Sequence, residues 1–179
     1  SSASEYRPKS FNDMIGQDAI VKTLNNAIKN DNIPQALLFC GPRGVGKTSC
    51  ARILAKTINN LEDDFEYNIF ELDAASNNSV EDIRNITDQI RIPPQTGRYK
   101  VYIIDEVHML SNQAFNAFLK SLEEPPEHVV FILATTEKNK ILPTILSRCQ
   151  IYDFKKVDNE SITKLLSKIC KEKKVKYED

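Results

Sequence analysis

Eight consecutive residues have the types and the spacing that a phosphate-binding loop needs. They match the pattern G-x-x-x-x-G-K-[ST] in full and are Gly41, Pro42, Arg43, Gly44, Val45, Gly46, Lys47 and Thr48. Three of the five glycines of the chain lie here, and glycine permits the backbone angles at which successive N–H groups point at phosphate oxygens. The segment predicts that Lys47 contacts the β- and γ-phosphates of a nucleotide, that Thr48 holds Mg²⁺, and that Ser49 completes the nucleotide-binding set.

A second candidate for nucleotide chemistry is the pair Asp105-Glu106, which directly follows the apolar run Val101-Tyr102-Ile103-Ile104. In phosphoryl transfer an aspartate at the end of such a strand holds the Mg²⁺ shell, and an adjacent carboxylate can polarise the attacking water. A strand that ends in solvated acids gives the same local pattern. Because the pair follows a complete phosphate-loop motif, we expect ATP or GTP hydrolysis, with Asp105 and Thr48 as Mg²⁺ ligands and Glu106 as the catalytic carboxylate.

Three further polar positions each leave two interpretations open. The hydroxyls of Thr135-Thr136 follow an apolar run, where they could orient a water near the γ-phosphate or cap the strand. Arg148, in Ser147-Arg148-Cys149, could stabilise the transition-state charge of a phosphoryl group or form a surface ion pair. His108 completes the pattern Asp-Glu-x-His, which also occurs in helicases and is a weak signal by itself.

Alternating helical and extended patterns must position these residues. Apolar runs predict strands, and apolar residues at helical spacing predict helices. The expected strands are 36–40, 68–73, 100–104, 129–134 and 150–154, and the expected helices are 18–30, 47–59, 159–173, one after each of the capping residues Ser79 and Ser111, and a short one near Pro143. The alternation indicates an α/β fold with a parallel sheet of about five strands between layers of helices.

Composition excludes several classes of protein. The chain has 179 residues, 41% of them hydrophobic, and 24 Lys and Arg residues against 25 Asp and Glu residues, so its formal net charge is −1. This balance excludes a strongly basic nucleic-acid-binding protein. No apolar run approaches the ~20 residues of a membrane-spanning helix, and the N-terminal residues contain no signal-peptide core, so we expect a cytoplasmic protein without membrane contacts. The four cysteines lack C-x-x-C spacing, and no zinc site is expected.

Several short motifs resemble those of one family, the gamma/tau subunits of bacterial DNA polymerase III clamp loaders, which are AAA+ ATPases. The resemblance runs from about residue 5 to residue 170. Besides the phosphate loop, its motifs are Tyr6-Arg7-Pro8, Phe11, Ile15-Gly16-Gln17, Leu72-Asp73-Ala74-Ala75-Ser76, Asp105-Glu106-Val107-His108-Met109-Leu110, Leu122-Glu123-Glu124-Pro125-Pro126, Ala134-Thr135-Thr136 and Ser147-Arg148-Cys149.

The resemblance implies roles that spacing alone does not show. Thr136 would be the sensor 1 position, and Arg148 would be an arginine finger that reaches the ATP on a neighbouring subunit. The residues implied near the adenine are Tyr6, Arg7, Pro8, Ile15 and Gly16. The family implies a P-loop ATPase module of the DNA-directed DNA polymerase III holoenzyme that uses Mg·ATP to load a sliding clamp onto primed DNA. Its implied partners are delta, delta-prime and further gamma/tau copies, and Asn77, Asn78, Ser79 and Arg84 would approach the DNA.

Two departures from the family pattern affect these expectations. Similar proteins have a four-cysteine zinc module after the helix that follows the phosphate loop, whereas residues 59–65 contain no cysteine. The family also implies a nucleotide-binding domain over residues 1–154 and the start of a helical lid domain over 155–179. The lid would continue further in the family and include a sensor 2 arginine, so the isolated chain is expected to hydrolyse ATP slowly.

Three other functions remain as alternatives. One is another AAA+ DNA-processing ATPase, such as a Holliday-junction motor or an archaeal-type clamp loader subunit, although Glu123-Glu124-Pro125-Pro126 and Ala134-Thr135-Thr136 disfavour it. Another is a structural subunit that keeps the fold without catalysis, which is expected to lose Lys47, Thr48 or Glu106, whereas this chain retains all three. The incomplete lid keeps a catalytically silent assembly fragment as an alternative. The last is an unwinding enzyme, which His108 alone suggests.

Overall fold

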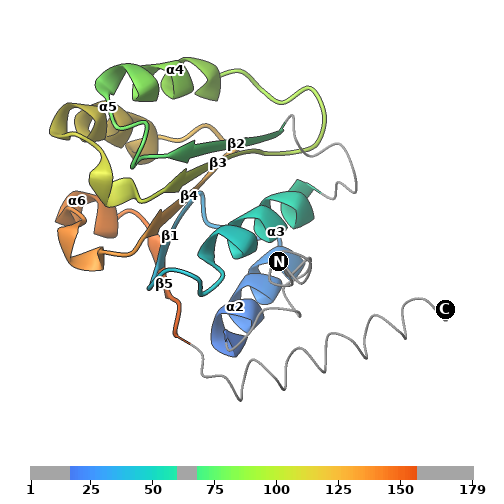
Figure 1. Cartoon of the computed structure of the whole chain (residues 1–179). Helices are drawn as coiled ribbons and strands as arrows, with labels where there is room; N and C mark the ends of the chain where they lie inside the picture. The colour runs from blue at the N-terminus through green and yellow to red at the C-terminus, as the bar shows by residue number, and fades with distance from the viewer. Residues whose placement is uncertain (1–16, 60–67, 157–179) are drawn as a thin grey trace, which may run out of the picture.

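A parallel sheet of five strands forms the centre of the molecule, in a computed structural model that describes residues 17–59 and 68–156 (Figure 1). The strands have the order β2-β3-β4-β1-β5, and every neighbouring pair is parallel. They are β1 Ala36–Cys40, β2 Ile69–Asp73, β3 Lys100–Asp105, β4 Val129–Thr135 and β5 Gln150–Asp153. The sheet confirms the predicted fold class and strand positions.

Helices cover both faces of this sheet (Figure 1). The α-helices are α2 Asp18–Lys29, α3 Lys47–Asn59, α4 Val80–Ile90, α5 Asn112–Glu123 and α6 Pro143–Leu146, and two short 3-10 helices are η3 Val107–Met109 and η4 Lys138–Lys140. Helices α2 and α3 pack on one face, and α4, α5 and α6 pack on the other. The predicted helix over 159–173 and nearly all of the expected lid domain lie outside the described residues.

Side chains along β1 alternate between the two faces, as the pleat of a strand requires. Leu37 and Phe39 join the core against α2 and α3, while Leu38 and Cys40 join the core against α4 to α6. All five residues of β1 and all seven of β4 are buried. Near-continuous apolar strands of this kind are typical of a parallel sheet that is covered on both faces.

Local capping signals determine where the helices that flank the site begin. The Ser79 side chain accepts from the backbone N–H of Asp82, and the Asp82 carboxylate accepts from the backbone N–H of Ser79, so a capping box starts α4. The Ser111 hydroxyl accepts from Ala114 N–H at 3.1 Å and starts α5 in the same manner. Helix α5 ends at Glu123, just before Pro125.

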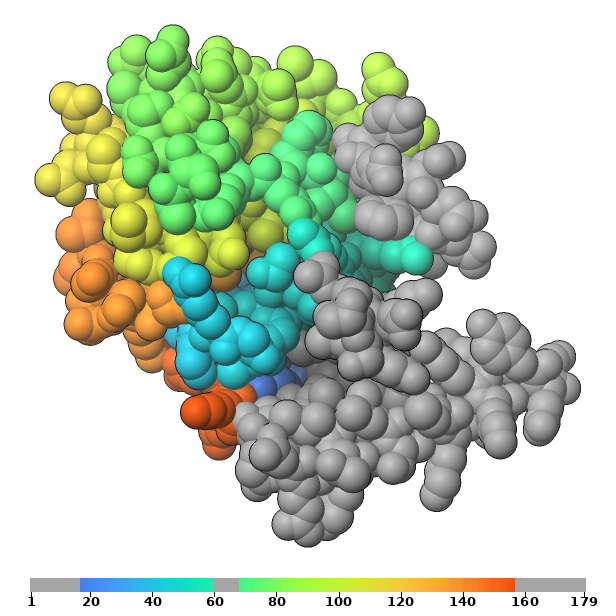
Figure 2. Space-filling model, viewed as in Figure 1, coloured from blue at the N-terminus to red at the C-terminus, as the bar shows by residue number. Residues whose placement is uncertain are grey.

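The strand order gathers three chain segments at one edge of the sheet. In the registers, Cys40 lies beside Thr135 and Ile104 lies beside Leu133. The residues that follow β1, β3 and β4 therefore meet at the carboxyl ends of neighbouring strands, the usual ligand position in an open α/β sheet. Figure 2 shows the loop after β1 in light blue at the surface, beside the orange-red end of β5.

Two cysteines contribute to the core as small apolar residues. Cys40 and Cys50 are free and buried, and burial raises the pKa of Cys40 to about 11 and that of Cys50 to about 12. Both thiols are therefore protonated near neutral pH. None of the helices in the described part of the chain is long and apolar enough to span a membrane.

Candidate active site

The phosphate loop connects β1 to α3, as its motif predicts. Gly44 has φ +77° and Gly46 has φ +97°, which side-chain-bearing residues rarely adopt. Gly41 is restricted by space as well, because a Cβ there would lie 2.7 Å from the carbonyl oxygen of Phe154, just after β5. The loop is therefore pressed against the end of β5, and glycine at its first position is a packing requirement.

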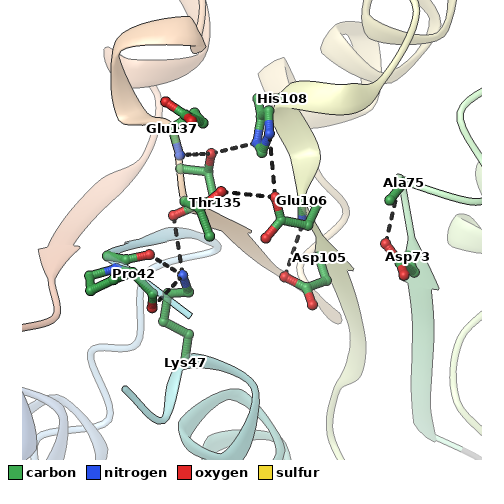
Figure 3. Close-up of polar contacts among 11 residues, drawn as sticks. Pro42, Lys47, Asp73, Ala75, Asp105, Glu106, His108, Thr135 and Glu137 are labelled. Carbon is green, nitrogen blue, oxygen red and sulfur yellow. Dashed lines mark hydrogen bonds and ion pairs between the residues drawn. The ribbon is translucent and has the colours of Figure 1, made fainter. Parts of the chain in front are cut away.

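Lys47 lies at the first position of α3 with its ammonium group turned back into the loop (Figure 3). Its Nζ donates to the carbonyl oxygens of Pro42 at 3.2 Å and Thr135 at 3.5 Å, and also to that of Gly41. The residue is 7% exposed. Burial lowers the pKa of Lys47, an effect that the negative charges of Glu106 and Asp105 partly oppose. The ammonium is thus held in the concave side of the loop, where a phosphate would lie.

Asp105 is the last residue of β3, and Glu106 follows in a tight turn. Asp105 Oδ1 accepts from the backbone N–H of Glu106 at 2.9 Å. Burial is the largest of the effects that raise the pKa of Asp105. Glu106 has φ +51° and ψ +45°, a left-handed conformation that is uncommon for a residue with a side chain. Strained backbone of this kind is concentrated at functional sites.

The carboxylate of Glu106 is contacted by two polar side chains. Thr136 Oγ1 donates to Glu106 Oε2 at 3.0 Å, and His108 Nε2 lies 3.3 Å from the same oxygen. The His108 ring also contacts Thr135 through Nδ1, at 2.8 Å from Oγ1 (Figure 3). Both threonines of the predicted doublet therefore belong to this cluster, Thr136 directly and Thr135 through His108.

His108 is the residue of this cluster that sequence reasoning undervalued. Its side chain is only 6% exposed and lies between Thr135 and Glu106, although the sequence suggested for it only a weak helicase pattern. The local signal is its spacing, since a residue two positions after Glu106 in a tight turn can fold back over it. The contact of His108 with Thr135, at the end of β4, cannot be predicted from that spacing, because the contact depends on the pairing of β3 with β4.

Oxygen donors for a Mg²⁺ ion lie at this edge of the sheet. Thr48 is half-buried in the first turn of α3, and the Asp105 carboxylate is close enough to Lys47 to influence its pKa. A hydroxyl and a carboxylate are ligands that Mg²⁺ accepts when it keeps waters and bridges phosphates. The residues present therefore fit Mg²⁺ bound together with a nucleotide. Arg43, in the same loop, is exposed.

Arg148 lies away from the phosphate loop of its own chain. It precedes the amino end of β5, where Gln150 pairs with Leu37, whereas Gly41 follows the carboxyl end of β1. Four residues of strand separate these levels, roughly 13 Å at ~3.3 Å per residue. Its guanidinium pairs with the half-exposed Glu123 at 3.2 Å, in a surface groove that Pro34, Pro125 and Cys149 also line. A surface ion pair, one of the two interpretations, is thus present within the chain.

The residues expected near the adenine lie outside the described part of the chain, namely Tyr6, Arg7, Pro8, Ile15 and Gly16. Gln17, the next residue, is buried and contacts the site. Its Nε2 donates to the carbonyl oxygens of Lys155 at 2.7 Å and Val45 at 3.5 Å, and its Oε1 accepts from Lys155 N–H at 3.0 Å. Sequence reasoning assigned no contact to Gln17, because its partners are far away in the chain.

Comparison with curated proteins gives the same family over nearly the whole chain. A family model described as "DNA polymerase III, delta subunit" matches residues 16–69 and 65–158. The DNA polymerase III subunit tau of Bacillus subtilis (strain 168) is 47% identical, over 97% of this chain and 34% of the relative. Subunit tau of Escherichia coli (strain K12) is 44% identical, over 98% and 30%.

A shorter relative is the DNA polymerase III subunit gamma of Buchnera aphidicola subsp. Baizongia pistaciae, which is 43% identical over 98% of this chain and 52% of the relative. The chain therefore spans between about a third and a half of these relatives. The alignment with the Bacillus subtilis subunit is 191 residues long, longer than the 179 residues of this chain, so that relative has residues without a counterpart here.

Solved structures show the same fold. A DNA polymerase III gamma subunit-related protein from Thermotoga maritima has a TM-score of 0.64 at 26% identity, over 76% of this chain and 47% of that one. The RuvB Holliday junction branch migration motor of Thermotoga maritima has a TM-score of 0.71 at 23% identity, over 89% and 52%. The likeness to RuvB shows the fold alone. The chain belongs to the DNA polymerase III subunit family that the model describes, where it groups with the tau and gamma subunits, and its fold is that of a P-loop AAA+ ATPase.

Proposed function

We propose that this chain is the ATPase module of a DNA polymerase III clamp loader, which binds and hydrolyses Mg·ATP to load a sliding clamp onto primed DNA. The observation that carries the proposal is the convergence of a complete phosphate loop with Asp105 and Glu106 at the carboxyl ends of β1 and β3. The similarity to tau and gamma subunits supports the clamp loader as the context. Residues 1–154 are proposed as the nucleotide-binding domain and 155–179 as the beginning of a lid.

Each site residue has a proposed part in binding or in hydrolysis. The phosphates lie on the loop formed by Gly41, Pro42, Arg43, Gly44, Val45, Gly46, Lys47, Thr48 and Ser49. Lys47 neutralises the β- and γ-phosphates, and Thr48 and Asp105 hold Mg²⁺. When bound, Mg²⁺ supplies charge neutralisation at the β- and γ-oxygens. Glu106 polarises the attacking water. Thr136, directly after β4, fixes the Glu106 carboxylate and completes the catalytic set.

Arg148 is proposed to act on the nucleotide of a neighbouring subunit. Its place at the amino ends of the strands supports this, because the phosphate loop of the same chain is at the opposite edge of the sheet. An arginine supplied from another subunit stabilises the transition-state charge of phosphoryl transfer. In this proposal the ion pair with Glu123 is the arrangement of the unassembled chain.

Other polymerase III subunits are the proposed partners, namely delta, delta-prime and further gamma/tau copies, together with the sliding clamp. The net charge of −1 favours contact with DNA through the assembled complex over tight binding by one chain. The segment proposed to face DNA contains Asn77, Asn78, Ser79 and Arg84. It includes Ser79 of the capping box of α4, and Arg84 is exposed on that helix.

The experiment that tests this proposal is a calorimetric titration of the chain with Mg²⁺ and a non-hydrolysable ATP analogue. We expect micromolar binding, and a loss of about tenfold or more in Lys47→Ala, because the variant removes a charge-assisted contact to phosphate. Lys22→Ala, at an exposed position of α2, is the matched control and should bind like the parent chain. Equal affinities of Lys47→Ala and the parent chain would contradict the loop assignment.

An assay with partner subunits separates the alternatives. ATP hydrolysis that rises only when sliding clamp and primed DNA are both added supports the clamp loader. Hydrolysis that DNA alone stimulates fully, without any clamp, would indicate an unwinding enzyme or another DNA-processing motor.

A further inference from the structure

We propose that His108 is a positioning residue for ATP hydrolysis, which holds the Glu106 carboxylate in place through an imidazole that is protonated on Nε2. The proposal rests on the proposed function, in which Glu106 polarises the attacking water. His108 acts through Glu106 and has no assigned contact with the nucleotide. His108 lies in η3, the short helix that begins directly after Glu106 in the sequence.

Of the two neutral tautomers of the His108 ring, one satisfies both of its contacts. The side chain is 6% exposed, with Nδ1 2.8 Å from Thr135 Oγ1 and Nε2 3.3 Å from Glu106 Oε2. An ionised carboxylate oxygen only accepts hydrogen bonds, so Nε2 must carry the proton. In a neutral ring Nδ1 is then an acceptor, and the Thr135 hydroxyl donates to it.

The hydroxyl of Thr135 can make that donation while it also accepts from a backbone group. Glu137 N–H donates to Thr135 Oγ1 at 2.9 Å. That bond uses a lone pair and not the hydroxyl hydrogen, which can point at His108 Nδ1. A chain of polar contacts then runs from Glu137 N–H through Thr135 and His108 to Glu106 (Figure 3). The opposite tautomer would place the Nε2 lone pair against a carboxylate oxygen and cost the Glu106 contact.

Two side chains that contact the same oxygen orient the Glu106 carboxylate. Thr136 Oγ1 donates to Oε2 at 3.0 Å, and His108 Nε2 lies 3.3 Å from Oε2 as an ion-pair contact. Neither of these donors occupies Oε1, so that oxygen is the one available to accept from a water. Without these two contacts, rotation of the Glu106 side chain would be less restricted.

The same cluster contacts the phosphate loop through the main chain of Thr135. Its carbonyl oxygen accepts from Gly41 N–H at 3.2 Å and from Lys47 Nζ at 3.5 Å. Thr135 therefore contacts the loop with its carbonyl and His108 with its hydroxyl. A shift of Thr135 would change both contacts. In the proposal, His108 therefore also links the position of Glu106 to that of the phosphate loop.

Three substitutions at His108 distinguish positioning from packing. In Gln the amide nitrogen occupies nearly the place of Nε2 and can donate to Glu106, whereas Asn places its polar atoms near Nδ1 and is too short. In the full chain, assembled with its partner subunits, His108→Ala and His108→Asn should lower kcat about tenfold or more, with analogue affinity unchanged within about threefold. His108→Gln should stay within about threefold of the parent chain.

A double-mutant cycle tests whether the effect passes through Glu106. Glu106→Gln should itself lower single-turnover hydrolysis by at least about 100-fold, and His108→Ala should add no further loss in that background. A tenfold further loss, or equal rates for His108→Asn and His108→Gln, would overturn the positioning role. Parent-like hydrolysis by Glu106→Gln would instead contradict the proposed function, so the two failures are distinguishable.

The tautomer can be measured without any variant. Nitrogen NMR of the nucleotide-free chain labelled at histidine should show His108 protonated at Nε2 and bare at Nδ1 at neutral pH. Thr135→Val keeps the side-chain shape and removes the donor to Nδ1, and we expect it to weaken this preference. A His108 ring protonated at Nδ1 in the parent chain would overturn the proposal, whether or not the variants fold.

Discussion

At the scale of single residues, burial sets the charge balance of the candidate site. Burial lowers the pKa of Lys47 and raises the pKa of Asp105, so each ionised group has lost hydration that the folded chain does not fully replace. Backbone carbonyls hold the Lys47 ammonium, and the Glu106 N–H holds one oxygen of Asp105. A phosphate would supply the opposite charge for Lys47, and a divalent cation would supply it for Asp105. These two residues therefore favour ligand binding and lower the stability of the ligand-free chain.

Asp105→Asn should therefore stabilise the nucleotide-free chain while it weakens Mg²⁺-dependent nucleotide binding. The substitution keeps a side-chain oxygen that accepts from Glu106 N–H and removes the poorly hydrated charge. Because the folded pKa of Asp105 is raised, the parent chain loses stability as the pH rises above the ordinary carboxyl value of 3.8. The gain in Asp105→Asn should be present at neutral pH and shrink as the pH falls towards that value.

Urea unfolding of both proteins between pH 4 and pH 8 checks this prediction. The exposed Asp88→Asn, on α4, is the control and should show no such pH-dependent gain. A variant that is less stable than the parent chain at neutral pH would contradict it.

At the scale of elements, the phosphate loop is supported from behind by the chain that follows β5. Phe154 N–H donates to Cys40 O at 2.7 Å, and Phe154 O would lie only 2.7 Å from a Cβ at position 41. Gln17 connects the same segment to the beginning of α2 through its amide. The loop is thus fixed by contacts from both ends of the described chain, besides the glycines of its own motif.

Gln17→Ala should lower the free energy of unfolding by about 1–3 kcal/mol, because it leaves the N–H and C=O groups of Lys155 without the side-chain amide they now bind. Analogue affinity should fall as well, since Val45 and the loop lose their neighbour. The measurement is urea unfolding together with calorimetry. Gln113→Ala, at an exposed position on α5, is the control. Equal stability of the two variants would argue against a supporting role for Gln17.

At the scale of the whole molecule, the sheet separates Lys47 in the phosphate loop from Arg148, although both are proposed to act in ATP hydrolysis. The phosphate loop is at the carboxyl ends of the strands, and Arg148 is at their amino ends. A parallel sheet holds these edges at a fixed distance, so no side-chain rotation joins them within one chain. If Arg148 acts on a nucleotide, the nucleotide belongs to a second subunit, and hydrolysis depends on assembly.

Arg148→Ala should leave analogue binding unchanged and lower ATP hydrolysis by the assembled complex on the order of 10³-fold, the range of arginine fingers. Arg148→Lys should not restore the rate, because an ammonium lacks the planar fork of donors. Steady-state hydrolysis with and without partner subunits measures both effects.

Glu123→Gln separates this role from the surface ion pair. The pair is half-exposed and contributes only ~0–1 kcal/mol, so breaking it should leave the assembled rate near that of the parent complex. A loss of hydrolysis in Glu123→Gln that equals the loss in Arg148→Ala, or a loss in the unassembled Arg148→Ala chain, would contradict action on a neighbouring subunit.

Much of this protein could be predicted from its sequence because the relevant signals are local. The phosphate loop is a contiguous motif, Ser79 and Ser111 begin helices within their own turns, and the strands around 36–40 and 129–134 are apolar throughout. Asp105-Glu106 ends a strand in the same contiguous manner. The fold class and the position of the candidate site follow from these signals, since residues after parallel strands gather at one edge.

What the tertiary structure alone decided are the contacts between segments that are distant in the chain. Thr136 binds Glu106, His108 lies between Glu106 and Thr135, and Gln17 binds Lys155 from 138 positions away. The contacts that Thr135 and Thr136 make with His108 and Glu106 depend on the pairing of β3 with β4, and the contact of Gln17 joins the start of α2 to the chain after β5. These long-range contacts leave no trace in local spacing. The sequence around Arg148 allows two interpretations for the same reason, because the distance of Arg148 from the phosphate loop follows from the pairing of β1 with β5.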